Sequence, residues 1–75
     1  MSAAPQLQVV KRSEVRPRLM RLKGGAAYLA ISPWQLRRLV QNGELPVVKI
    51  GDSGPWLLDV KDLDLFVERS KRLLD

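Results

Sequence analysis

A chain of 75 residues with a net charge of +5 is expected to form one small domain with a small buried core. It has no cysteine and no histidine, which excludes disulfides and thiolate metal sites and removes the commonest metal ligand and general base near neutral pH. The sequence shows no signal peptide, transmembrane run, nucleophile–base pair, phosphate loop or metal cluster. We therefore expect a cytoplasmic protein that is not an enzyme, with no cofactor, metal, membrane partner or small-molecule substrate.

The positive charge is concentrated near the N-terminus. Residues 1–23 hold six basic residues and one acidic residue, whereas residues 24–75 hold seven of each. Residues 1–18 show no sustained periodicity and contain Pro5 and Pro17, so we predict a flexible basic arm over 1–18 and a folded domain over 19–75. Such an arm either attracts a polyanion or serves as a solvated leader.

A short first helix is predicted over residues 23–29, where Leu22, Ala26 and Leu29 recur at helical spacing. Gly24 and Gly25 lie in its first turn and weaken it by roughly 1 kcal/mol each relative to alanine. Their small size also lets this helix approach the next one closely.

A second helix is predicted over residues 33–42, with clear signals at both ends. Ser32 is a capping residue, Pro33 occupies the first helical position, and Gln35 completes a capping box. Gly43 supplies the left-handed residue that ends the helix. Two short helices joined by the turn at 30–32 form a helix-turn-helix arrangement.

The second helix has two different faces. The spacing predicts a buried stripe of Leu36, Leu39 and Val40. A second stripe should face solvent and consists of Trp34, Arg37, Arg38 and Gln41. An exposed tryptophan with two arginines and a glutamine suits contact with nucleic acid better than it suits solubility alone.

The remaining chain predicts a hairpin and a third helix. Residues 47–50 and 56–58 read as strands around a dense turn signal at 51–55, with Trp56 in the core. Asp59 caps the last helix, whose apolar stripe continues from Leu63 toward Leu73 or Leu74. The predicted fold class is mostly α with a small β-hairpin, a winged helix-turn-helix.

Several short motifs of this chain occur together in one known family. They are Ala26, Tyr28-Leu29, Ile31-Ser32-Pro33, Leu36, Arg38-Leu39, Gly-Glu-Leu-Pro at 43–46, Val-Lys-Ile-Gly at 48–51, Trp56, Asp62-Leu63 and Phe66. In these, residues 22–67 resemble the excisionase-type winged helix-turn-helix family, within the superfamily of the mercury-resistance regulators. The resemblance implies double-stranded DNA binding, with helix 33–42 in the major groove and the wing on the backbone or minor groove.

The same resemblance implies particular biological roles. Family members include recombination directionality factors that bend DNA beside an integrase, small phage and prophage regulators, and DNA-packaging subunits. The implied partners are therefore double-stranded DNA, an integrase or recombinase, and another copy of the chain on tandem sites.

Some positions depart from the family pattern. The wing tip carries Asp52 and residues 53–55, and Leu57 follows Trp56, where the family often has arginine or lysine. Trp34 and Arg37 look exchanged relative to the family order. In the first helix, Gly24 replaces a frequent acid and Arg21 replaces the usual cap. An acidic wing tip on a neutral domain keeps a second hypothesis open, a protein-interaction module or a phage packaging or assembly subunit with the same fold.

The candidate DNA contacts differ in how specific their signals are. Arg37 and Arg38 can grip phosphate or read guanine, and the alternative is a solvated face paired with Glu44 or nearby aspartates. Gln35 either reads adenine or serves only the cap, and Trp34 either contacts DNA, meets another protein, or folds back against the arm or wing. The full set of candidates is Arg18, Arg21, Lys23, Ser32, Trp34, Gln35, Arg37, Arg38, Gln41 and Lys49.

Overall fold

The computed structural model describes residues 16–74. The prediction of a flexible basic arm falls mostly on residues 1–15, which lie outside the described residues. The boundary between arm and domain after residue 18 stays a prediction.

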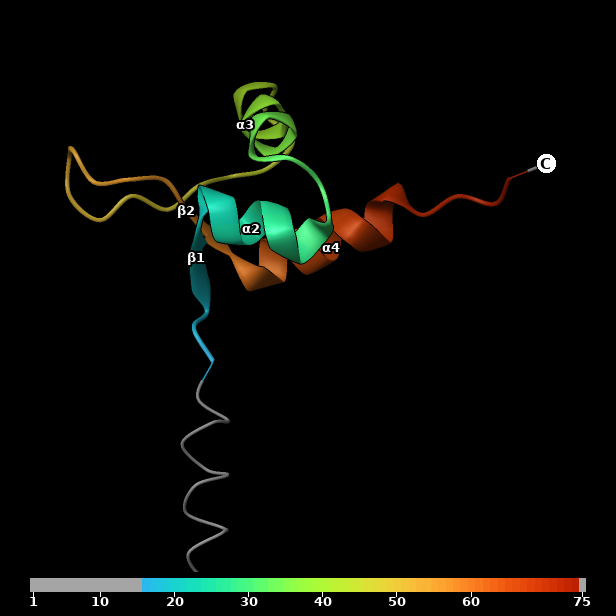
Figure 1. The fold of residues 1–75 in the computed structure, drawn as a ribbon, viewed down its shortest axis with the longest axis horizontal. Helices are drawn as coiled ribbons and strands as arrows, with labels where there is room; N and C mark the ends of the chain where they lie inside the picture. The colour runs from blue at the N-terminus through green and yellow to red at the C-terminus, as the bar shows by residue number, and fades with distance from the viewer. Residues whose placement is uncertain (1–15, 75) are drawn as a thin grey trace, which may run out of the picture.

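Three helices and a two-stranded antiparallel sheet make up the fold, which confirms the predicted fold class (Figure 1). In chain order the elements are β1 (Leu19–Arg21), α2 (Leu22–Leu29), α3 (Pro33–Gln41), β2 (Leu57–Asp59) and α4 (Val60–Ser70). Both α3 and α4 pack against α2, and they make few contacts with each other. Helix α2 is therefore the central element of the domain.

The sheet differs from the predicted hairpin. Strand β2 pairs with β1, with Leu19 opposite Asp59 and Arg21 opposite Leu57. The predicted pairing of residues 47–50 with 56–58 is reduced to one bridge, in which Val48 and Leu57 exchange two backbone hydrogen bonds of 2.7 and 2.9 Å. Strand β1 was not predicted, because three residues are too few to show an alternating pattern.

The end signals of α3 are confirmed. The Ser32 hydroxyl accepts a hydrogen bond from the Gln35 amide, and the Gln35 side chain accepts one from the Ser32 amide, both at 3.0 Å. Gly43 has a φ of 81°, the left-handed conformation that glycine adopts without strain. The helix ends at Gln41, one residue earlier than predicted, and Asn42 is its C-cap.

The core lies where α2 meets its neighbours. Its fully buried side chains are Ala26, Leu36, Leu45, Leu58 and Leu63. A Cβ placed on Gly25 would lie 3.1 Å from both Leu36 Cδ2 and Leu58 Cδ1. The expected close approach of the first two helices is thus confirmed, and Gly25 is the residue that permits it.

Two predictions about the C-terminal half are wrong. The apolar stripe of α4 does not reach Leu73 and Leu74, which are 98% and 93% exposed. The chain leaves the helix at Lys71, whose backbone is extended, so Arg72 also lies beyond the last turn. Trp56 is half-buried and not part of the fully buried core, because its ring lies under the exposed Arg37 side chain.

Candidate nucleic-acid interface

The outer face of α3 presents the side chains that the sequence places there. Trp34 is 63% exposed, and Arg37, Arg38 and Gln41 are exposed as well. The opposite face holds Leu36 against α2. The capping box fixes where the helix starts and therefore how both faces are oriented.

Each of the two arginines lies over an indole ring. Arg38 Cζ lies 4.9 Å from the centre of the Trp34 ring, one turn away on the same helix. Arg37 Cζ lies 5.3 Å from the centre of the Trp56 ring and so links α3 to the wing. Such contacts are worth about 0.5–1 kcal/mol each at exposed sites. They restrain the position of each guanidinium group, while the guanidinium N–H donors that extend past the indole ring can still bind another partner.

Neither arginine is paired with an acid of the part of the chain that the structure describes. The ion pairs formed within residues 16–74 are Arg18 with Asp59 at 2.8 Å and Lys71 with Glu68 at 3.0 Å. The expected alternative, in which Glu44 or nearby aspartates neutralise this face, is therefore not the arrangement observed. The positive charge of α3 remains available to an anionic partner.

Ser32 and Gln35 serve the cap. The Ser32 hydroxyl and the Gln35 carbonyl oxygen each accept a backbone amide. The capping interpretation of Gln35 is thus the one for which the structure shows contacts. Its side-chain amide nitrogen makes no hydrogen bond to another described residue, so contact with a base stays a prediction.

The other basic candidates are spread over different elements. Lys49 is exposed in the wing beside Val48, and Lys23 is exposed in the first turn of α2. Arg18 and Arg21 belong to the β1 region, which lies on the side of α2 away from α3 in Figure 1. The structure therefore gathers the α3 residues on one face, whereas Arg18 is paired with Asp59.

Arg18 is held by the fold. Its Nε and Nη2 donate to the two carboxylate oxygens of Asp59 at 3.1 and 2.8 Å. These hydrogen bonds, followed by one from the Lys61 amide, hold the pKa of Asp59 below its usual value. Arg18 thus fastens the chain entering β1 to the start of α4, and its predicted DNA contact stays untested.

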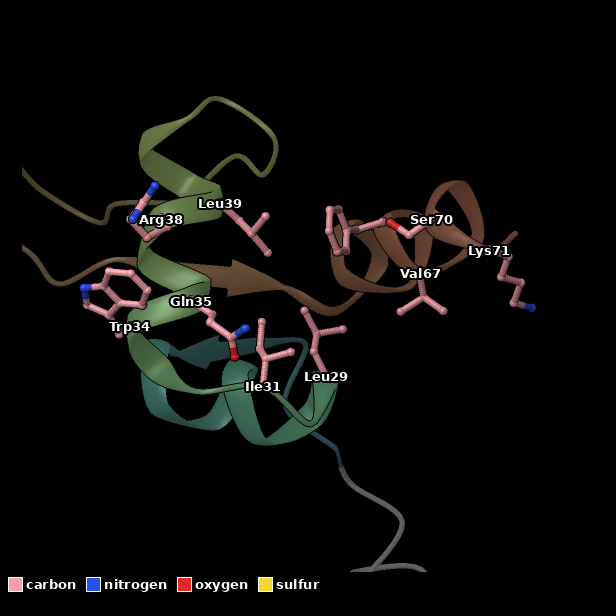
Figure 2. Close-up of a pocket in the computed structure, with 10 residues that line it drawn as sticks. Leu29, Ile31, Trp34, Gln35, Arg38, Leu39, Val67, Ser70 and Lys71 are labelled. Carbon is pink, nitrogen blue, oxygen red and sulfur yellow. The ribbon is translucent and has the colours of Figure 1, made fainter. Parts of the chain in front are cut away.

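A groove that the sequence did not indicate opens between α3 and α4 (Figure 2). It encloses about 550 Å³, with Leu29, Ile31 and Leu39 on its floor. Trp34 and Val67 also line it and are more exposed. No local pattern of the sequence indicates this groove, because its lining comes from three separate segments of the chain.

Within residues 16–74, no three metal-ligating side chains come together, and no helix has the length and apolarity needed to cross a bilayer.

Comparison with known proteins adds no relative: no family model matches the chain, and neither a curated protein nor a solved structure matches it.

Proposed function

We propose that this chain binds double-stranded DNA in the cytoplasm, with α3 in the major groove. The observation that carries the proposal is the outer face of α3, where Arg37 and Arg38 are exposed, restrained by indole rings and unpaired with any acid among the described residues. The resemblance of residues 22–67 to excisionase-type proteins supports a role as a recombination directionality factor or a phage or prophage regulator.

The shape of α3 suits this role. Its nine residues span about 13 Å at 1.5 Å per residue. The B-DNA major groove, about 12 Å wide, admits one α-helix. Only one side of α3 packs against α2, and Figure 1 shows it at the edge of the fold. The face that carries the arginines is therefore accessible to a duplex.

The side chains would have separate roles. Arg37 and Arg38 contact phosphate or the acceptor edge of guanine, because a guanidinium group can donate two parallel hydrogen bonds. Lys49 contacts the backbone from the wing. The wing tip carries Asp52, which phosphate repels, so wing contact should be made by Lys49 and not by the tip.

The test replaces both arginines, Arg37→Ala with Arg38→Ala, and measures binding to a duplex from beside the protein's own gene by fluorescence anisotropy. Log affinity falls as log salt concentration rises. Removing two phosphate contacts should make this slope less steep by about 2. A matched control, Arg69→Ala with Arg72→Ala, removes the same charge near the end of α4.

We expect the α3 variant to lose affinity while keeping the native circular dichroism spectrum, and the α4 control to lose much less. Equal affinity of the α3 variant and the native chain would contradict the proposal. Equal losses in the α3 variant and the control would show attraction by net charge alone.

A protein-interaction module is the second candidate, and the groove between α3 and α4 favours it. This alternative predicts weak duplex binding without sequence preference. The same titration separates the two candidates, because a sequence-reading α3 must distinguish the cognate duplex from a scrambled one.

A further inference from the structure

The groove between α3 and α4 is an apolar surface that no other part of residues 16–74 covers. Its floor consists of half-buried side chains, Leu29, Ile31, Leu39 and Phe66. Val67 stands at its side on α4 and is 39% exposed. An open apolar groove of this kind is a typical docking surface for a short apolar segment.

The chain also carries an apolar segment that the rest of the described chain leaves uncovered. Leu73 and Leu74 are 98% and 93% exposed. Figure 1 shows the segment after α4 running away from the helices. Two adjacent leucines held in solvent and an empty apolar groove on the same molecule are complementary surfaces.

The segment is poorly placed to fill the groove of its own chain. Lys71 lines that groove and has an extended backbone, with φ −67° and ψ 139°, which directs the chain onward. Leu73 follows only two residues later, a reach of about 7 Å. Entry would need a reversal at Lys71-Arg72, which has none of the residues that favour turns.

Charge also favours this occupant. Arg38 lines the groove and makes no ion pair within residues 16–74. Asp75 follows Leu74 directly in the sequence and brings a carboxylate with the two leucines. A docked segment therefore supplies both apolar side chains for the floor and an acid for the groove's unpaired cation.

We propose that Leu73 and Leu74 of one copy dock in the α3–α4 groove of a second copy. The contact joins two different surfaces, the tail of one copy and the groove of another. A two-leucine contact is small, so association is weak and depends on concentration. It does not rest on the proposed DNA binding, because neither surface needs DNA.

Sedimentation equilibrium of the full chain tests the proposal, from about 10 μM to about 1 mM, a range that suits a small interface. We expect the average mass to rise with concentration. A mass that stays at the monomer value overturns the proposal. A second result also overturns it. If Leu73→Asp with Leu74→Asp changes the NMR amide shifts of the groove residues in the monomer, the groove is occupied by the tail of its own chain.

Three variants locate the contact. The tail variant is Leu73→Asp with Leu74→Asp, and the groove variant is Val67→Glu. The control is Leu65→Glu, which changes a 56% exposed apolar residue of the same helix outside the groove. At concentrations at which the control associates like the native chain, the tail and groove variants should stay monomeric. Equal loss in the control, or association of the tail variant, overturns the proposal.

Mixing the two defective variants gives the sharpest result. The groove variant keeps an intact tail and the tail variant keeps an intact groove, so together they should form a complex of one copy each and grow no further. The absence of that complex overturns the tail-to-groove contact. If Val67→Glu unfolds by circular dichroism, the tail variant alone decides, since its exposed leucines contribute little to folding.

Discussion

The inner and outer faces of α3 differ in burial and in chemistry, although their residues are interspersed along the same nine positions. On the inner face, Leu36 is fully buried between α2 and the rest of the core. On the outer face, Arg37 and Arg38 lie over indole rings in contact with solvent. The inner face determines whether the domain folds, whereas the outer face carries charged and aromatic side chains and contributes little to stability. Function can therefore vary on one face while the fold depends on the other.

The strongest test of this difference is Leu36→Ala on the inner face. Truncating a fully buried leucine should lower the free energy of unfolding by about 2–5 kcal/mol. That loss is a large part of the stability of so small a domain. Urea unfolding followed by circular dichroism measures it. Arg38→Ala on the outer face is the comparison, and a loss as large as that of Leu36→Ala would refute the division.

The glycine pair of α2 tests how tightly the inner face is packed. Gly25→Leu should lower stability by about 1–3 kcal/mol, because the added side chain meets Leu36 and Leu58 at once. Gly24→Ala should instead raise it by about 0.5–1 kcal/mol, since its Cβ makes only an ordinary contact with Met20. Thermal unfolding of both variants measures the difference. The opposite order of the two melting temperatures would show that α2 and α3 are not closely packed.

The cap of α3 affects both faces together. Ser32→Ala removes the acceptor for the Gln35 amide and should lower stability by about 1 kcal/mol. Ser32→Asp is the control, because aspartate caps helices equally well. Chemical denaturation measures both variants, and the prediction fails if aspartate is as disruptive as alanine.

The smallest expected effect is on how stability depends on pH. Helix α3 contains no carboxylate, so the acid-sensitive contact lies elsewhere, between Arg18 and Asp59. Arg18 lowers the pKa of Asp59, so the pair stabilises the fold above the unfolded pKa of about 3.9 and loses that effect as pH falls through the lower folded value. Asp59→Asn keeps a capping side chain but removes the charge.

Melting temperatures measured across acidic pH should therefore fall less steeply for Asp59→Asn than for the native chain, and the two curves should converge at the acid end. An unchanged pH profile in the variant would assign the acid sensitivity to other carboxylates.

The helices were predictable because their signals are local. Ser32, Gln35 and Gly43 define the ends of α3 within one residue, and the spacing of Leu36, Trp34 and Arg37 assigns its faces. Each signal involves residues at most a few positions apart, where the geometry of the helix fixes the outcome.

The sheet and the groove could not be predicted in the same way. Strand β1 is three residues long and is defined by its distant partner β2. Trp56 reads as core from its place on a strand, yet it stacks on Arg37. The left-handed backbone of Ala30, with a φ of 61°, carries no glycine signal. These features depend on tertiary contacts that single residues do not encode.

The pairing of β1 with β2 has a consequence for the order of folding. Arg18 and Asp59 lie 41 positions apart in the chain, whereas α2 and α3 are neighbours in sequence. Because contacts between distant segments form more slowly than local ones, we expect the two helices to associate first and the sheet to close last. During synthesis, β1 is made before its partner β2. The newly made chain therefore exposes an unpaired strand edge until residue 59 has left the ribosome.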